Sequence, residues 1–210
     1  MTESNRQESA QLFVIAAPSG AGKTTLVKAL VTRHPDLRFS ISYTTRAKRR
    51  NEADGVDYLF VGTEEFQRLM DSGELLESAE VFDNHYGTSR TQVEKQLGAG
   101  HDVILEIDWQ GARQVRESMP EAVSVFILPP SLDELERRLR ERRTDSEAVI
   151  ERRLRDATND MSHWPEFDYV IINDDLDTAV ADLEAVIGGT GGACSTDNVM
   201  LRRAVAGIVG

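Results

Sequence analysis

Short runs of mainly apolar residues recur along the chain and give the first indication of its architecture. A continuous apolar run is typical of a strand in a parallel sheet that is covered on both faces. Such runs occupy Leu12–Ala16, Val103–Ile107, Val123–Leu128 and Tyr169–Ile172. We therefore predict that these segments form a buried parallel sheet.

Segments of helical periodicity separate several of these runs. They cover Lys23–Val31, Ser131–Arg142, Ser146–Met161 and Thr178–Ile187. In the second segment, Ser131 and Glu134 have the spacing of a capping box, which marks the start of a helix. Strands that alternate with helices indicate a doubly wound α/β fold, which we expect to span residues 12–187.

The stretch from about 38 to 88 departs from this alternation. It contains short alternating segments at 39–43 and 58–61, and a short helical pattern over Glu64–Met70. We predict a small mixed α/β insertion that covers one edge of the core.

Both ends of the chain differ from the middle in composition. Residues 1–11 are polar and are predicted to form a disordered arm without the apolar centre of a signal peptide. Gly188–Gly192 is predicted to be a flexible linker to a short apolar segment, Val199–Val209, to which the sequence assigns no role. No apolar stretch reaches the length of about 20 residues that a membrane-spanning helix needs.

The charge of the chain limits its partners. The 210 residues carry a formal net charge of −12, which disfavours non-specific binding to nucleic acid or to an anionic membrane. The one cysteine, Cys194, excludes an intrachain disulfide and fits a reducing cytoplasm. Association of identical copies is compatible with the sequence and is not specified by it.

Arginine is unusually frequent for such an acidic chain. There are 20 arginines and four lysines, and eight of the arginines fall between Arg137 and Arg155. The planar guanidinium suits phosphate oxygens. Composition alone equally allows a solvated helix face on which arginines pair with glutamates.

A phosphate-binding loop follows the first predicted strand. The segment Ala17-Pro18-Ser19-Gly20-Ala21-Gly22-Lys23-Thr24 matches the Walker A pattern except that Ala17 replaces the first glycine. The glycines let successive N–H groups and the following helix N-terminus point at an anion. Lys23 is predicted to reach the β- and γ-phosphates and Thr24 to ligate Mg²⁺.

Several further segments resemble guanylate kinases, in order and at the family's spacing from about residue 11 to 187. They are Ser40–Arg46 with Arg49, Gly55–Tyr58, Glu77–Val81, Asn84–Thr88, Asp108–Gly111 and Ile172–Asp175. The resemblance implies the P-loop nucleoside monophosphate kinase fold, a parallel sheet flanked by helices with a GMP-binding insertion and an arginine-rich lid at about 137–155. It also implies transfer of the γ-phosphoryl group of Mg·ATP to GMP or dGMP in purine nucleotide metabolism, with no nucleic acid or membrane partner.

The resemblance assigns residues to both substrates. It implies ATP-binding residues Pro18, Ser19, Gly20, Ala21, Gly22, Lys23, Thr24, Thr25 and Asn173. It implies GMP-binding residues Ser42, Arg46, Arg49, Tyr58, Glu77, Tyr86, Thr88, Glu106 and Asp108. Arginines and phenols suit the GMP phosphate, whereas a carboxylate at Glu77 can accept from guanine N1–H and the 2-amino group. Asn173 is equally compatible with a plain Asx turn.

The residues expected to contact the transferring phosphoryl group are mainly lysine and arginine. The resemblance implies catalytic roles for Lys23, Arg46, Arg138, Arg142 and Arg153, and a magnesium site at Thr24 and Asp108, either directly or through water. Two positions depart from the family pattern, because Glu106 stands where aspartate is usual and Arg143 where glycine is usual.

Other classes of function remain as alternatives. A guanylate-kinase-like module that binds phosphopeptides without catalysis would keep the fold, but the donor-site residues Lys23, Thr24 and Asp108 are all present. A P-loop kinase for another small acceptor is disfavoured by the pairing of Ser42 with Glu77. The guanine-reading and switch motifs of GTPases are absent.

Overall fold

The computed structural model describes residues 10–81, 83–141 and 147–209. Its main sheet has the strand order β2-β7-β1-β8-β9, and all neighbouring strands are parallel. The strands are β1 (Leu12–Ala16), β2 (Arg38–Phe39), β7 (Val103–Glu106), β8 (Val123–Leu128) and β9 (Tyr169–Ile172). The four apolar runs are confirmed as strands, with β7 ending one residue earlier than predicted.

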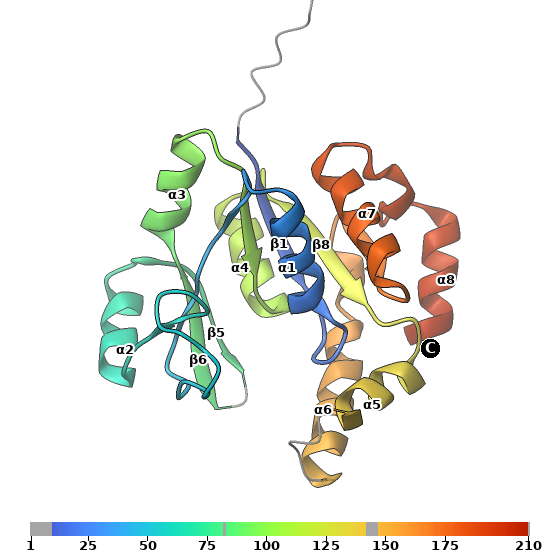
Figure 1. Cartoon of the computed structure of the whole chain (residues 1–210), viewed down its shortest axis with the longest axis horizontal. Helices are drawn as coiled ribbons and strands as arrows, with labels where there is room; N and C mark the ends of the chain where they lie inside the picture. Colours follow the sequence, from blue (N-terminus) through green and yellow to red (C-terminus); the bar gives the residue numbers. More distant parts are fainter. Residues whose placement is uncertain (1–9, 82, 142–146, 210) are drawn as a thin grey trace, which may run out of the picture.

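Helices cover both faces of this sheet (Figure 1). They are α1 (Lys23–Arg33), α4 (Trp109–Ser118), α5 (Leu132–Glu141), α6 (Glu147–Met161) and α7 (Leu176–Ile187). Alternate residues of β1 lie on opposite faces of the sheet. Val14 packs with apolar residues of α4, α5 and α6, whereas Ile15 packs with apolar residues of α1 and α7. The capping serine is confirmed, since the Glu134 amide donates to Ser131 Oγ at 3.1 Å. This arrangement is the predicted doubly wound α/β fold.

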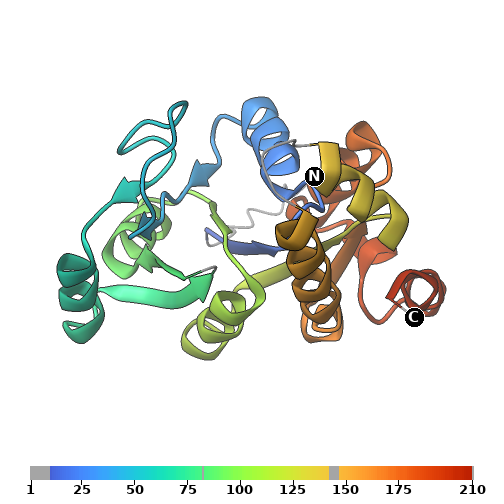
Figure 2. The same cartoon turned by 90° about the horizontal axis from the view of Figure 1, so that it is seen from below.

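A second, smaller sheet lies to one side of the core (Figure 2). Its strands, in the order β4-β3-β6-β5, are β4 (Leu59–Phe60), β3 (Tyr43–Thr44), β6 (Asn84–Ser89) and β5 (Leu75–Val81). The helix α2 (Thr63–Asp71) packs on this sheet through Phe66 and Leu69, and α3 (Arg90–Gly98) leads back to the core. The mixed insertion is thus present. Its first predicted residues, Arg38 and Phe39, instead form β2, which pairs with β7 in the main sheet.

The C-terminal segment is folded against the core, which corrects the prediction of a flexible linker. A 3-10 helix, η2 (Gly191–Cys194), is followed by α8 (Val199–Val209). The Thr196 amide donates to the Asp168 carbonyl at 2.9 Å, and Ser195 forms a bridge with Tyr169 on the edge strand β9. Val205 is completely buried in the main core. Backbone pairing and one apolar anchor therefore fix a segment whose glycines suggested flexibility.

The predicted N-terminal arm falls mostly outside the described residues. At the last residue of the predicted arm, the Gln11 amide donates to Asp102 Oδ1 at 2.7 Å, so this end of the arm contacts the core. Among the described residues, no helix combines the length and the apolar character needed to cross a membrane.

Candidate active site

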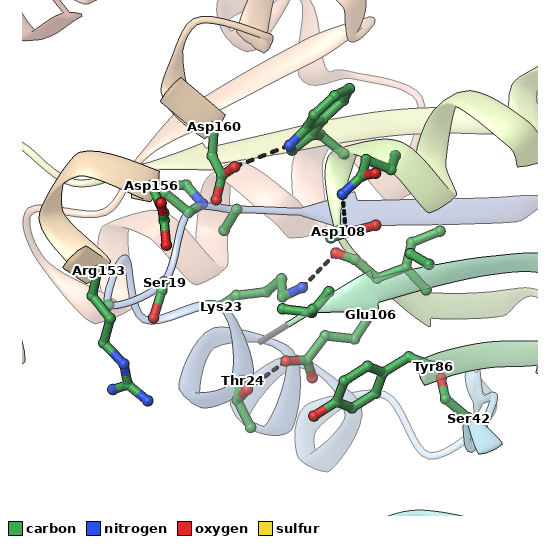
Figure 3. Close-up of a pocket in the computed structure, with 18 of the residues that line it drawn as sticks. Ser19, Lys23, Thr24, Ser42, Tyr86, Glu106, Asp108, Arg153, Asp156 and Asp160 are labelled. Carbon is green, nitrogen blue, oxygen red and sulfur yellow. Dashed lines mark hydrogen bonds between the residues drawn. The ribbon is translucent and has the colours of Figure 1, made fainter. Parts of the chain in front are cut away.

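A cleft of about 540 Å³ lies between the main sheet and the insertion, with α6 on its third side. Its size suits a small-molecule site. Residues of the loop before α1, of the insertion and of α6 line it together, including Ser19, Lys23, Thr24, Ser42, Arg46, Arg49, Tyr58, Glu77, Tyr86, Glu106, Asp108, Arg153, Asp156 and Asp160. Figure 3 shows side chains from these parts of the fold directed at one space. The structure thus gathers most of the predicted site residues, which are far apart in the sequence.

The loop between β1 and α1 has the backbone that its glycines permit. Gly20 and Gly22 have φ angles of 95° and 91°, in the left-handed region that L-residues with a Cβ rarely adopt. A Cβ on Gly22 would also lie 2.4 Å from Asn173 Nδ2. The loop closes on itself through the Ala21 amide and the Pro18 carbonyl, 3.2 Å apart, and leads directly into the N-terminus of α1. The geometry is that of an anion-binding loop.

Lys23 lies deep in the cleft. Its Nζ donates to the carbonyl of Ile107 at 2.5 Å (Figure 3). Burial lowers the pKa of Lys23, while the carboxylates of Glu106, Asp108 and Asp160 oppose that change. The ammonium group is therefore held among carboxylates and can exchange its carbonyl partner for an anionic ligand.

Oxygen donors suited to a magnesium ion lie between β7 and α1. The Thr24 hydroxyl donates to Glu106 Oε1, and Asp108 follows two residues later as the N-cap of α4, accepting from the Gly111 amide at 2.8 Å. Within the described residues, no group of three or more His, Cys, Asp or Glu side chains could hold a metal alone. Mg²⁺ in kinases is commonly held by one or two protein oxygens together with substrate phosphates, so this donor set fits it.

The departure at Glu106 has a visible consequence. Its carboxylate reaches the hydroxyl of Thr24, at the start of α1, from the end of β7. Glu106 also lines the cleft beside the insertion. The longer side chain therefore connects the phosphate loop with the side of the cleft predicted to hold GMP.

A buried carboxylate bonded by a hydroxyl lies at the insertion side of the cleft. Glu77 on β5 is 4% exposed and Thr88 on β6 is 1% exposed, and the Thr88 hydroxyl donates to Glu77 Oε1 at 2.7 Å. Burial raises the pKa of Glu77 to about 7, although the bond from Thr88 acts in the opposite direction. Ser42, which is predicted to bind GMP, lines the same cleft. A buried acceptor held in place in this way is suited to reading hydrogen-bond donors on a ligand.

Arg46 has a partner that sequence reasoning missed. Its guanidinium donates two hydrogen bonds to Glu52, at 2.8 and 3.1 Å, and lies 5.2 Å from the centre of the Tyr58 ring. The Tyr58 and Tyr86 rings meet edge to face, 5.9 Å apart. Glu52 is an acidic residue in an arginine-rich loop. Its position close to Arg46 in the sequence could have indicated that the two residues pair. The pair orients Arg46, while Arg49 lies at the cleft with a more exposed side chain.

The predicted lid arginines lie in different surroundings. Arg153 lines the cleft from α6. Arg138 instead lies behind the phosphate loop, where it donates to the carbonyls of Asn173 and Ala21 at 3.0 and 3.3 Å and to Glu134 at 2.7 Å. The predicted catalytic Arg142 and the departure at Arg143 lie outside the described residues.

Surface arginines of this segment pair with acids, as the composition suggested. Arg137 bonds Glu134 and Glu141, and Arg140 bonds Glu136 and Glu147. Arg152 of α6 also lines the cleft.

The Asn173 side chain points to the phosphate loop. It is 6% exposed, and its Nδ2 donates to the Ala21 carbonyl at 2.7 Å. Thr25 lines the cleft next to Thr24. Asn173 therefore supports the loop in this structure, and its predicted contact with a nucleotide base stays a prediction.

Two residues of the cleft were missed because their partners are distant in sequence. The indole N–H of Trp109 donates to Asp160 Oδ1 at 3.0 Å. The Trp109 ring also stacks on His163, with the ring centres 3.6 Å apart. Burial raises the pKa of Asp160. These contacts join the start of α4 to the C-terminal part of α6.

Comparisons with known proteins find relatives that match most of the chain. The family model described as guanylate kinase matches residues 9–189. A guanylate kinase of Alkalilimnicola ehrlichii is 57% identical over 175 residues, which are 83% of this chain and 86% of that protein. A guanylate kinase of Pseudomonas fluorescens is 57% identical over 175 residues, or 83% and 85% of the two chains. The crystal structure of guanylate kinase from Anaplasma phagocytophilum has a TM-score of 0.73 and 34% identity, with 95% of each chain covered.

Proposed function

This chain belongs to the guanylate kinase family, and we propose that it transfers the γ-phosphoryl group of ATP to GMP, giving ADP and GDP. The observation that carries the proposal is that the phosphate loop and the buried Glu77, which is bonded from behind by Thr88, line one cleft. A triphosphate bound at the loop and a base bound at Glu77 would meet between them.

The acceptor base is read by Glu77. Guanine presents a hydrogen on N1 and an amino group at C2, and an ionised carboxylate accepts from both in a bidentate pair. Adenine presents an acceptor at N1 and no amino group at C2, so the same buried carboxylate would receive neither bond from the base and would face the N1 lone pair. Thr88 holds one oxygen of Glu77 in place, and Ser42 supplies a hydroxyl for guanine O6.

The acceptor phosphate is held by Arg46, Arg49, Tyr58 and Tyr86. Two guanidinium groups neutralise a dianion with charge-assisted bonds, and two phenols add neutral donors. Glu52 fixes the direction of Arg46 before the ligand arrives, which reduces the entropy lost on binding.

The donor triphosphate is held by the N–H groups of the phosphate loop and by Lys23. Arg138 and Asn173 support this loop from behind through the Ala21 carbonyl. Arg153 from α6, together with Arg142 by family resemblance, neutralises charge on the transferring group. Phosphoryl transfer depends mainly on positioning and electrostatic stabilisation, which this set of cations supplies.

Magnesium belongs to the proposal as the partner of ATP. The residues that would hold it are Thr24 and Asp108, the latter directly or through water, with Glu106 beside them. Bound there, the ion would supply positive charge that neutralises the phosphate oxygens. Glu106 holds the Thr24 hydroxyl in the cleft until the ion and the phosphates arrive.

The cellular setting follows from the same proposal. ATP and GMP are intracellular nucleotides, and the single cysteine, Cys194, is a buried free thiol, so we place the enzyme in the cytoplasm. A homo-oligomer is compatible with this function and is not required by the cleft.

The experiment is a coupled assay that measures ADP formation from ATP with GMP, AMP, CMP and UMP as acceptors. We expect turnover with GMP and little with the others, because discrimination by a buried hydrogen-bonding site can reach ~10⁴-fold. Lys23→Ala serves as the control, because it lacks the Lys23 ammonium group that is expected to bind the donor phosphates. Equal rates with AMP and GMP, or full activity in Lys23→Ala, would refute the proposal, and binding of GMP without turnover would favour the phosphopeptide-type module.

A further inference from the structure

Gln114 on α4 makes a two-hydrogen-bond contact with the backbone of Ser78. The Ser78 amide donates to Gln114 Oε1 at 3.0 Å, and Gln114 Nε2 donates to the Ser78 carbonyl at 2.8 Å. Both groups are half-buried. One glutamine thus satisfies the donor and the acceptor of a single residue, in the way that a neighbouring strand would.

The contact lies on the edge of the smaller sheet. β5 pairs on one side with β6, where Ser78 is opposite Gly87, and it is the last strand in the order β4-β3-β6-β5. A residue of an edge strand that directs its N–H and C=O away from the sheet needs another partner. Gln114 supplies that partner at the residue directly after Glu77.

Two further structural features occur at Glu77 of β5. The pairing register with β6 shifts between Leu75 and Glu77, and such an irregularity redirects the side chains next to it. A Cβ added to Gly111 of α4 would lie 2.5 Å from Glu77 Oε2. The Glu77 carboxylate is therefore packed against the first turn of α4, where only glycine leaves room for it.

Asp108, Gly111 and Gln114 are spaced three residues apart along α4. Residues at this spacing lie on one face of a helix. Asp108 caps the helix on the donor side of the cleft, Gly111 receives the Glu77 carboxylate, and Gln114 bonds the backbone that carries it. The helix therefore sets the distance between the metal-binding end of the cleft and the residue that reads the base.

We propose that Gln114 is a positioning residue for base recognition, which fixes β5 on α4 so that Glu77 meets guanine at a set distance from Asp108. This inference rests on the proposed function. Loss of the contact would leave the Ser78 backbone groups without their partner and free β5 to shift on the helix. The Glu77 carboxylate would then meet the N1–H and 2-amino group with poorer geometry, while the phosphate loop would keep its structure.

The readout is discrimination between GMP and IMP, whose base is the same except for the missing 2-amino group. We would measure kcat and KM for both acceptors, and KM for ATP, in wild type and in two variants. Gln114→Leu removes both bonds at similar volume. Gln114→Glu keeps an acceptor for the Ser78 amide and sets a carboxylate oxygen against the Ser78 carbonyl. We expect each variant to raise KM for GMP and to narrow the GMP/IMP ratio of kcat/KM by about tenfold, since misplacement by ~1 Å can cost up to ~10²-fold.

Arg113→Gln is the matched control on the same helix. Its side chain is half exposed and bonds Glu166, away from β5. We expect it to leave the GMP/IMP ratio unchanged even where it lowers the melting temperature, and we expect KM for ATP to stay at its wild-type value in all variants. Folded, active Gln114 variants with the wild-type ratio would overturn the role of Gln114 and leave the proposed function standing. A wild-type enzyme that does not phosphorylate GMP would overturn both.

Discussion

The side-chain amide of Asn173 donates a hydrogen bond of 2.7 Å to the main-chain carbonyl of Ala21. This bond joins the end of β9 to the middle of the phosphate loop, and Arg138 donates to the same carbonyl at 3.3 Å. The two donors together fix the orientation of the Ala21 carbonyl and so hold the loop in its shape. The loop is thus shaped by groups more than 100 residues away in the chain, as the separations of 152 and 117 residues show.

We predict that Asn173→Ala weakens ATP binding without changing the choice of donor base. The buried Ala21 carbonyl would lose its closest partner and keep the bond from Arg138, and one lost hydrogen bond typically costs about 0.5–1.5 kcal/mol. Steady-state kinetics should show a raised KM for ATP and an unchanged ratio of kcat/KM for ATP over GTP. A marked change in that ratio would mean that Asn173 reads the base of the donor.

We predict that GMP binding strengthens as pH rises through about 7, the value to which burial raises the pKa of Glu77. Only the ionised carboxylate accepts both guanine donors. Calorimetric titration with GMP between about pH 5.5 and 8.5 tests this, with Glu77→Gln as the necessary control because the second phosphate pKa lies near ~6. The pH dependence that remains in Glu77→Gln belongs to the phosphate, and an identical profile in both proteins would contradict the role of Glu77.

The same carboxyl group makes a prediction for stability without ligand. In the unfolded chain Glu77 titrates near ~4.3, so between that value and about 7 the folded state binds more protons. The free energy of unfolding should therefore fall as pH rises across this window. Glu77→Gln should show a smaller fall, measured by urea denaturation at several pH values. A larger fall in the variant would show that Glu77 is not protonated in the folded state.

We predict that Arg153→Ala lowers kcat at saturating substrates and changes GMP affinity little. An arginine that stabilises transferring charge can be worth ~10³-fold or more. Arg140→Ala is the control, because Arg140 bonds Glu136 and Glu147 on the outer surface. Similar losses of kcat in the two variants would remove Arg153 from the catalytic set.

We predict that truncation after Gly188 destabilises the protein, since the C-terminal segment is folded. The truncation removes Val205, whose full burial is worth about 1.5–3 kcal/mol, and the backbone bond from Thr196 to Asp168. Thermal denaturation should show a melting temperature several degrees lower. Met200→Ala, at a side chain that is 71% exposed, should leave it unchanged. A truncated protein with the wild-type melting temperature would show that α8 contributes nothing to stability.

The main sheet and the phosphate loop could be predicted because their signals are local. Each buried strand is a continuous apolar run, and the loop needs glycines, a lysine and a threonine at fixed spacing. The resemblance to guanylate kinases added the acceptor side, and the cleft gathers Ser42, Arg46 and Glu77 as expected. The sheet, the loop and the acceptor residues can be recognised from the order and spacing of residues, which are visible in the sequence.

The partners of these residues could not be predicted in the same way. Glu52 at Arg46, Asp160 at Trp109 and Gln114 at Ser78 are polar contacts that periodicity does not encode. The glycine-rich stretch before α8 suggested flexibility, but bonds to β9 and one buried valine order it.

The fold class and the anion-binding loop could be read from local pattern and spacing, and the side chains expected at the reaction followed from the resemblance to guanylate kinases. How these groups are held became known only from the folded structure. It buries Glu77, and this burial raises the pKa of Glu77. It also directs Asn173 and Arg138 to the phosphate loop. The physical reason is that burial, pKa and hydrogen-bond geometry depend on the neighbours that folding brings together, and those neighbours come from distant parts of the chain.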